Sequence, residues 1–301
     1  MKSLSGEEKK FDKSWYDLLW PNSNGNPEII RGVERQVVSM LSVAGETPES
    51  TKGKSCLELG CGTGEATLAL VKKYGLRVTA VDYNEHSLAL AKKLIEQNGF
   101  SQSVTFITQD LQTLELGNST FDFVISKGVL HHLHDPEKAV ARGLMYLKKD
   151  GKCIFRVNWL YGWMFKKKSV PNYAFLKLMY VLFPNPQKRM KVGEKLFGKR
   201  LEGKPNREAV IFEYGSMYKP MRLVTFLKWF KKNNIDFINS DPDHSLHTLF
   251  KKVFSITTSS KKPSFFSRTI VQCMYMFILR THVTLTVVGR KILTKSIKNL
   301  I

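Results

Sequence analysis

The chain has 301 residues and a formal net charge of +21, and 43% of its residues are hydrophobic and 11% aromatic. This length allows one large domain or two modest ones, and this aromatic content excludes a disordered polyampholyte because it supplies the apolar surface that a core needs. Four cysteines without a C-x-x-C pair or a zinc-finger spacing exclude a disulfide-rich miniature protein and favour reduced thiols inside the cell.

The N-terminal end of the sequence shows no secretory signal peptide, because its first 13 residues are polar. The longest nearly apolar runs, at 174–183 and 270–279, are half as long as the ~20 residues that a membrane-spanning helix needs. We therefore expect a soluble, cytoplasmic protein without a transmembrane segment, with peripheral attachment to a membrane as the alternative.

Strand and helix patterns alternate through the first half of the chain. Short apolar or β-branched runs predict strands, and Asn84 and the pair Asp135–Pro136 are residue types that begin helices. Strands that alternate with helices of about 10–15 residues predict a parallel sheet with helices on both faces. The expected strands are 54–60, 76–82, 104–108, 121–126 and 152–158, and the expected helices are 65–74, 85–98 and 136–147.

The positive charge is concentrated in the second half of the chain. Residues 1–158 contain 20 Lys and Arg against 19 Asp and Glu, whereas residues 159–301 contain 27 against 7. Such an excess favours an anionic partner, and a phospholipid surface, a nucleic acid and an acidic substrate all fit. A solvated basic surface without a partner is an equally good interpretation.

The second half also interrupts the alternation of strands and helices with two long inserts. The first insert mixes aromatic residues with a lysine cluster at 166–168. A helical pattern at 220–233 and strand patterns at 235–239 and 282–288 predict that the α/β fold continues around the second insert. We expect an N-terminal cap at 1–50, a cofactor-binding core at 51–158, a basic aromatic insert at 159–220, and a C-terminal part of the fold at 221–301 with a second insert at 241–280.

The clearest chemical signal is the sequence ELGCGTG at 58–64. It follows a predicted strand and opens a predicted helix, where glycines allow a sharp turn and a close approach of the backbone to a ligand. Asp82 closes the next strand, 22 residues after Gly60, which is the spacing of the ribose-binding acid in nucleotide-binding βαβ units. The G-x-G-x-G pattern and the acidic Glu58 differ from the dinucleotide motif and disfavour NAD and FAD.

These motifs resemble those of the class I S-adenosylmethionine-dependent methyltransferases, and in particular the UbiE-like, methyltransferase type 11 branch that acts on small molecules. The resemblance covers about residues 55–157 and implies a Rossmann-like, seven-stranded, mostly parallel sheet with helices on both faces, an antiparallel last strand and lid inserts. It is carried also by VTAVDYN at 78–84, FITQDL at 106–111, FDFVISKGVLHHLHDP at 121–136 and LKKDGKCIF at 147–155.

The resemblance implies S-adenosyl-L-methionine as the cofactor and a role for each matching residue. Asp82 would accept hydrogen bonds from both ribose hydroxyls, and Asp110 would lie beside the adenine amino group. Glu58 would orient the glycine loop or the amino group of the cofactor, or else satisfy only the N–H groups of the loop. In the N-terminal cap, Tyr16 is expected near the cofactor carboxylate. The implied cofactor-binding residues are Glu58, Gly60, Cys61, Gly62, Gly64, Asp82, Tyr83, Asp110, Leu111 and Ser126.

His131 and His132 are the candidate catalytic residues. Methyl transfer from a sulfonium requires mainly positioning and exclusion of water, and an oxygen or nitrogen nucleophile also needs a base. Both histidines follow the fourth strand at the carboxyl side of the sheet, where such ligands bind. Packing or loop hydrogen bonding is the competing interpretation. His134 lies nearby, but no cysteine or acidic cluster accompanies the three histidines, so we predict no metal site.

The class of acceptor is narrowed by motifs that the sequence does not contain. The segment SKGV at 126–129 stands where relatives that methylate nucleic acids or glutamine carry an Asn/Asp-Pro-Pro-aromatic motif, and it has no nucleophilic cysteine. The resemblance therefore implies O- or C-methylation of a small lipid-like, quinone-like or other secondary metabolite, with the aromatic inserts as its lid. The alternatives are an RNA methyltransferase that uses the basic half, and a regulatory protein that binds the cofactor without catalysis.

Overall fold

The computed structural model describes residues 25–158, 178–179, 181–183, 185–202, 221–241 and 284–292. Several predictions fall outside these residues. They include the role of Tyr16, the lysine cluster at 166–168, Cys273, and most of both inserts. Within the described part of the chain, no helix is both long enough and apolar enough to cross a membrane.

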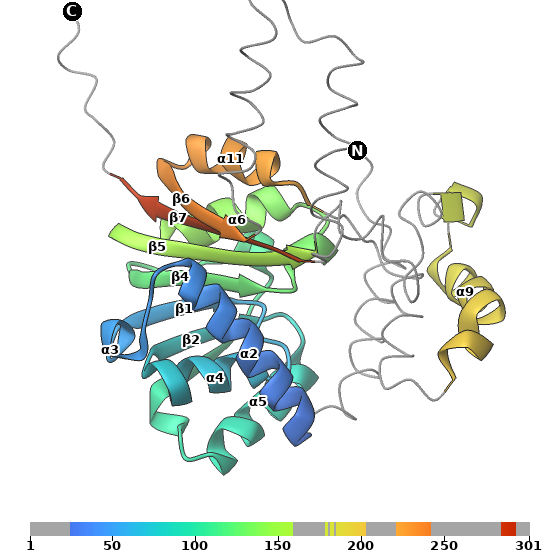
Figure 1. Cartoon of the computed structure of the whole chain (residues 1–301), viewed down its shortest axis with the longest axis horizontal. Helices are drawn as coiled ribbons and strands as arrows, with labels where there is room; N and C mark the ends of the chain where they lie inside the picture. The colour runs from blue at the N-terminus through green and yellow to red at the C-terminus, as the bar shows by residue number, and fades with distance from the viewer. Residues whose placement is uncertain are drawn as a thin grey trace, which may run out of the picture.

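A seven-stranded sheet forms the centre of the fold. Its strands are β1 (Ser55–Leu59), β2 (Arg77–Asp82), β3 (Val104–Thr108), β4 (Phe121–Lys127), β5 (Leu147–Asn158), β6 (Ile235–Asp241) and β7 (Thr284–Lys291). Their order is β3-β2-β1-β4-β5-β7-β6 (Figure 1). The first five strands pair in parallel, whereas β7 pairs antiparallel with both β5 and β6. The predicted fold class is confirmed.

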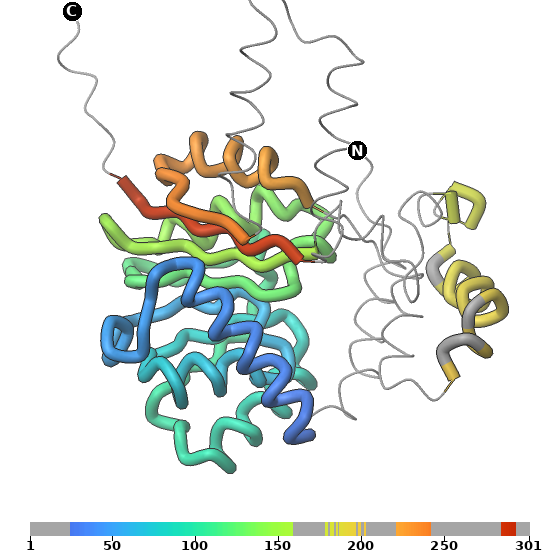
Figure 2. Tube along the Cα trace, viewed as in Figure 1, coloured from blue at the N-terminus to red at the C-terminus, as the bar shows by residue number. Residues whose placement is uncertain are grey.

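Helices cover both faces of the sheet, so the fold has three layers (Figure 2). One core contains side chains from α2 (Pro27–Val43), α4 (Glu65–Tyr74) and α5 (Glu85–Gln97). The other contains side chains from α6 (Pro136–Met145) and α11 (Leu223–Lys232). The remaining described helices are the short α3 (Pro48–Thr51), α9 (Pro186–Leu201), and the single 3-10 turns η1 (Ser101–Ser103), η2 (Leu111–Thr113) and η3 (Leu130–His132).

Helix caps follow from local sequence. The predicted cap at Asn84 is present, because its side chain accepts a hydrogen bond from Ser87 N at 2.9 Å. Helix α2, which the sequence analysis left unassigned inside the N-terminal cap, begins in the same way. The Asn26 side chain accepts from Glu28 N at 2.9 Å, and Pro27 occupies the first turn, where its missing N–H costs nothing.

Strand β5 begins five residues earlier than the strand predicted at 152–158. Leu147 already pairs with Phe121 of β4, and the register shifts between Phe121 and Phe123. Asp150 has a φ of 61°, so the chain turns within the strand rather than before it. The sequence pattern suggested a turn here because Asp150 and Gly151 are common turn residues.

The α11 side of the core is closed by aromatic packing. Phe226 and Phe155 are fully buried, with ring centroids 5.9 Å apart, and Phe230 packs on both. Replacing either buried phenylalanine by alanine costs about 3–5 kcal/mol. On β7, a Cβ added at Gly289 would lie 2.3 Å from Ile235 Cγ2, so α11, β6 and β7 pack too closely for any side chain at this position.

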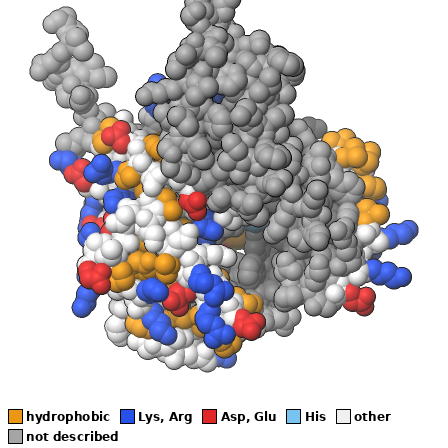
Figure 3. All heavy atoms as spheres, viewed as in Figure 1, with side chains coloured by type: hydrophobic (Ala, Val, Ile, Leu, Met, Phe, Trp, Pro, Cys, Tyr) orange, Lys and Arg blue, Asp and Glu red, His pale blue; other side chains and the backbone are white. Residues whose placement is uncertain are grey.

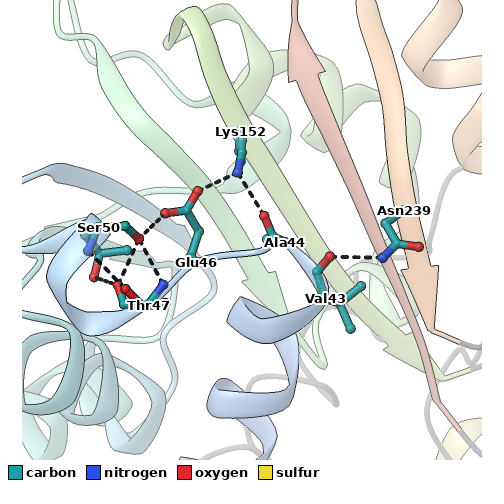
Figure 4. A network of polar contacts seen from close by, with 8 residues as sticks. Val43, Ala44, Glu46, Thr47, Ser50, Lys152 and Asn239 are labelled. Carbon is teal, nitrogen blue, oxygen red and sulfur yellow. Dashed lines mark hydrogen bonds and ion pairs between the residues drawn. The ribbon is translucent and has the colours of Figure 1, made fainter.

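A polar network at the amino edge of the sheet, the edge where β1 and β4 begin, anchors the end of α2 (Figure 4). Lys152 Nζ donates a hydrogen bond to the carbonyl of Ala44 at 2.8 Å and forms an ion pair with Glu46. The other oxygen of Glu46 accepts from Ser50 Oγ at 2.6 Å. These contacts satisfy a carbonyl at the C-terminal end of α2 and give the nearly buried Glu46 carboxylate two donors.

Candidate functional site

The glycine loop between β1 and α4 has two glycines that packing requires and one that faces open space. A Cβ at Gly60 would lie 2.5 Å from Val129 Cγ2, and one at Gly64 would lie 2.9 Å from Ala91 Cβ. A Cβ at Gly62 would meet no atom within 4 Å. All three have positive φ, which favours glycine. Gly62 is therefore the glycine past which a ligand has room to lie.

Asp82, at the end of β2, is joined to this loop by a hydrogen bond. Its Oδ2 accepts from Gly62 N at 2.9 Å, and its Oδ1 accepts from Asn84 N at 3.0 Å. Burial raises the pKa of Asp82, and the N–H donors of Asn84, Gly62 and Tyr83 oppose that shift. A carboxylate has about four acceptor positions, so at least one position of Asp82 remains for a hydroxyl group of a ligand beside these backbone donors.

Two buried glutamates lie next to the loop. Glu58 of β1 accepts a hydrogen bond from Thr67 Oγ1 at 2.7 Å, and burial is the main cause that raises its pKa to about 7. Glu65, the first residue of α4, accepts from Thr63 Oγ1 at 2.7 Å through Oε2. Its Oε1 is buried without a hydrogen-bond partner. An unsatisfied buried carboxylate oxygen is costly, so this atom favours a ligand that brings a donor, preferably a cationic one.

Lys127 is the last residue of β4 and interacts electrostatically with both glutamates. Burial lowers the pKa of its ammonium group, as does the charge of Arg156, whereas Glu58 and Glu65 raise it. None of the ion pairs found among the described residues involves Lys127 or either glutamate. The carboxyl edge of the sheet therefore holds charges of both signs that attract one another without direct contact.

The residues predicted for the adenine end lie at the ends of β2 and β3. Asp110 follows β3 and is exposed, and its Oδ1 accepts from Gln112 N at 2.8 Å as the cap of η2. Tyr83, directly after Asp82, is 40% exposed, whereas Leu111 is buried. Asp110 and Tyr83 therefore lie on the same edge as the loop and are accessible to a ligand.

Cys61 and Ser126 are placed differently from the other predicted cofactor residues. The Cys61 side chain belongs to the apolar core under α4, and burial raises the pKa of its thiol well above the usual value. Ser126 is fully buried, and its hydroxyl donates to the carbonyl of Leu59 at 2.8 Å, which ties β4 to β1. Both side chains are buried and stabilise the loop and the sheet. Only the backbone atoms of these two residues can contact a ligand.

His131 and His132 form a ring pair in η3, with centroids 4.2 Å apart. His131 is buried, and its Nδ1 accepts from the backbone N–H of Asn158 at 3.4 Å. Burial lowers the pKa of His131 well below its usual value, and burial lowers the pKa of His132 to about 4. Both rings are thus neutral at pH 7, and a neutral imidazole with so low a pKa accepts a proton poorly.

A metal centre is absent from the described part of the molecule. No three or more His, Cys, Asp or Glu side chains there are placed to hold a metal ion. A surface groove of about 460 Å³ lies between α2 and α4, where Ile30, Arg31 and Lys72 contribute to its walls. This groove lies on the outer side of α4, away from the glycine loop.

The comparison with protein families identifies the domain. Residues 57–155, which hold the loop, Asp82, Asp110 and both histidines, match a family model described as a methyltransferase domain. The chain therefore contains a class I S-adenosylmethionine-dependent methyltransferase domain. The match is to the methyltransferase type 11 domain and covers residues 57–155 alone.

Individual relatives and solved structures support this assignment. The ubiquinone biosynthesis O-methyltransferase of Coxiella burnetii is 29% identical over 130 residues, covering 43% of this chain and 49% of that protein. The structure of the [4+2]-cyclase SpnF has a TM-score of 0.56 and 13% identity, covering 97% of this chain and 100% of that one. Magnesium protoporphyrin IX methyltransferase from Synechocystis PCC 6803, with bound S-adenosylhomocysteine, has a TM-score of 0.50 and 15% identity, covering 94% and 99%.

These similarities differ in what they establish. The match to the curated relative covers about half of its length, and the solved structures, at 13% and 15% identity, establish the fold alone. That fold is the one that binds S-adenosylmethionine in methyltransferases.

Three charged residues near the site were not among the sequence predictions. They are Glu65, Lys127 and Arg156. Glu65 directly follows the last glycine of the loop, Lys127 ends β4, and Arg156 follows the apolar run CIF at 153–155 of β5. A charge at the carboxyl end of a buried strand is the signal that could have identified the two cations.

Proposed function

We propose that this protein transfers a methyl group from S-adenosylmethionine to an oxygen or carbon atom of a small organic acceptor. The observation that supports this most directly is Gly62, which leaves open space beside Asp82 within the segment that matches a methyltransferase domain. When bound, S-adenosylmethionine supplies an activated methyl group on a sulfonium, so the protein's task is to orient two reactants and exclude water.

The residues around the loop fit the chemistry of this cofactor. Asp82 would hold the ribose hydroxyls, and Asp110 would accept from the adenine amino group. The unsatisfied Oε1 of Glu65, with Glu58 nearby, would accept from the ammonium of the amino-acid end. The backbone of the loop could approach the cofactor closely, because positions 60, 62 and 64 are glycines.

The histidine pair contributes orientation more than proton transfer in this proposal. A base with a pKa of about 4 is a weak proton acceptor at pH 7, and His131 is buried against Asn158. We expect His132→Ala to lower turnover less than tenfold, because positioning carries most of the rate. A loss of about 10²–10⁴-fold with unchanged affinity for S-adenosylhomocysteine would identify His132 as the base instead.

A lipid-like or quinone-like acceptor is supported by the curated relative, whose name places it in ubiquinone biosynthesis as an O-methyltransferase. We infer a cytoplasmic enzyme that meets such an acceptor at a membrane surface. In the described part of the basic insert, Val181 is 76% exposed, Leu182 58% and Leu196 55%. Figure 3 shows hydrophobic and basic side chains side by side where α9 lies. The exposed lysines of α9 are Lys188, Lys191, Lys195 and Lys199.

Vesicle binding tests this membrane surface. Each lysine near an anionic leaflet contributes about 1 kcal/mol, and exposed apolar side chains add to it. Sedimentation with phosphatidylglycerol-containing vesicles should exceed that with pure phosphatidylcholine and fall at high salt. Replacing Lys191 and Lys195 by glutamate should reduce it, whereas the same change at the exposed Lys92 and Lys93 of α5 should not. Equal sedimentation with both vesicles would refute the membrane surface, and salt-dependent RNA binding would favour the nucleic-acid alternative.

The methyl transfer itself is tested with isotopically labelled S-adenosylmethionine and a small-molecule extract of the organism that makes the protein. Label should appear in a new small molecule with wild-type protein and not with Gly62→Val, which fills the open space of the loop. Gly99→Val is the matched control, because Gly99 also has positive φ and open space but lies at the end of α5. Binding of S-adenosylhomocysteine without any labelled product would indicate a regulatory binding protein.

A further inference from the structure

A row of polar residues crosses four strands at the carboxyl edge of the sheet. Lys127 of β4 pairs in register with Arg156 of β5, Arg156 with Thr286 of β7, and Thr286 with Asp241 of β6. Residues in register on neighbouring strands point to the same face. The row two residues further into the sheet is apolar on β4, β5 and β7, where Ile125, Ile154 and Val288 belong to the core under α2 and α4, and it continues on β6 with Asn239. The polar row thus begins where this core ends.

Two cations lie side by side in this row. Neighbouring strands are about 4.8 Å apart, and like charges directly opposite one another are destabilising. Arg156 Nη1 donates to Thr286 Oγ1 at 3.2 Å, and burial lowers the pKa of the guanidinium while the charge of Asp241 raises it. A guanidinium has five donors, so Arg156 retains the capacity for a planar, two-point contact with an anion.

The row also continues the site in space. Strand β4 lies directly beside β1 and its glycine loop, and β5 lies one strand further on. Arg156 and Lys127 are each partly exposed. Helix α2 crosses this face from the amino edge of β5 towards α4 and α5, so among the described helices it leaves the carboxyl end of β5 and the adjacent amino end of β7 uncovered (Figure 1).

We propose that Arg156, with Lys127 beside it, binds a carboxylate or phosphate group of the methyl acceptor, an inference that rests on the proposed methyl transfer. An anion between the two cations would relieve their repulsion and satisfy the unused donors of Arg156. The acceptor is then an amphiphilic or aromatic molecule with an acidic group, anchored beyond the sulfonium end of the cofactor.

The same anion chemistry has a second source, the carboxylate of the cofactor itself. The glycine loop follows β1, which lies beside β4 and two strands from β5, so a cofactor bound at the loop would meet Lys127 before Arg156. A substitution of Arg156 therefore distinguishes an anionic group of the acceptor from the carboxylate of the cofactor. Affinity for S-adenosylhomocysteine should fall only if Arg156 binds the cofactor.

The test separates the small-molecule extract on an anion-exchange resin before incubation with labelled cofactor. The labelled product should arise from the retained fraction. Arg156→Gln should raise the apparent KM for that fraction about 10–100-fold, with S-adenosylhomocysteine affinity within about twofold of wild type, since hydrogen bonds to charged groups have this magnitude. Arg156→Lys should recover part of the loss. Arg290→Gln, at the exposed amino-edge end of the same strand pair, is the matched control and should change neither value.

Three results would overturn the inference. Labelled product arising only from the unretained fraction would show that the acceptor carries no anion. A loss of tenfold or more in S-adenosylhomocysteine affinity with Arg156→Gln would assign the cation to the cofactor. An unchanged KM with a lower melting temperature would assign Arg156 a structural role. Absence of label from every fraction would instead refute the proposed methyl transfer, and the anion site with it.

Discussion

Charged side chains at the two edges of the sheet differ in how they are paired. At the amino edge, Lys152 is bound to the carbonyl of Ala44 and to Glu46, and Lys148 is paired with Asp122 at 3.0 Å. Lys291 donates to the carbonyl of Leu147 at 2.8 Å. At the carboxyl edge, Glu65 has a buried oxygen without a hydrogen bond, and Lys127 takes part in none of the described ion pairs.

This difference separates stability from binding within one fold. Directly paired charges hold the amino edge together, and removing Lys152 leaves the nearly buried Glu46 carboxylate without its cation. Charges that are desolvated but not paired weaken the folded state. A ligand group of opposite charge recovers that free energy when it binds. We therefore expect substitutions at the amino edge to change unfolding, and those at the carboxyl edge to change ligand affinity.

Asp82→Ala should give the largest effect, a loss of about 10²–10⁴-fold in affinity for S-adenosylhomocysteine, because two hydrogen bonds of about 1.5–3 kcal/mol each are removed. Calorimetry measures it. Asp122→Ala, at the amino edge, is the matched control and should lower the melting temperature without changing affinity. Unchanged affinity in folded Asp82→Ala would contradict the assignment of the cofactor site.

Lys152→Met tests the amino edge of the sheet and should lower the stability of the fold. It leaves the Glu46 carboxylate nearly buried without its cation, and we expect a decrease of about 2–3 kcal/mol in the free energy of unfolding, less than for a fully buried pair because Lys152 is partly exposed. Urea denaturation measures this. Lys73→Met, which removes the exposed pair with Glu34, should cost under about 1 kcal/mol. Equal losses of unfolding free energy in the two variants would show that the network of Figure 4 stabilises the fold no more than an exposed ion pair does.

Glu65→Gln should separate stability from ligand affinity in a single variant. It removes an unsatisfied buried carboxylate but keeps an acceptor for Thr63, so the melting temperature should stay equal or rise. Affinity for S-adenosylhomocysteine should fall about tenfold, since a charge-assisted contact with its ammonium is lost. Thermal denaturation and calorimetry on the same sample check both. A lower melting temperature with unchanged affinity would make Glu65 a structural residue.

The pH dependence of binding should give an effect no larger than that of Glu65→Gln. Because the pKa of Glu58 is raised to about 7, its contribution to stability is present below the unfolded pKa near 4.5 and is lost as pH rises through about 7. A cationic ligand group favours the ionised form, so affinity for S-adenosylhomocysteine should increase about tenfold between pH 6 and pH 8. Glu58→Gln should flatten this profile, and a profile that keeps its slope in this variant would assign the proton to another group.

The local part of the site was predictable from sequence, and its long-range part was not. The glycine loop, Asp82 and the helix cap at Asn84 depend on residues within one βαβ unit, where spacing determines placement. The row of Lys127, Arg156 and Asp241 depends on strand register between segments separated by tens of residues, and no periodicity within a strand reveals that register. The burial of His131 likewise depends on β5 and is invisible in the pattern LHHL.

The position of β7 has a consequence for how the nascent chain folds. This strand follows β6 in the sequence but lies between β5 and β6, and Gly289 packs against Ile235 without room for a side chain. Until Thr284–Lys291 is synthesised, β5 and β6 each present an unpaired edge, and such edges promote aggregation. The glycine loop, Asp82 and β1 to β5 all precede this segment, so the residues of the candidate cofactor site are synthesised before the sheet is complete.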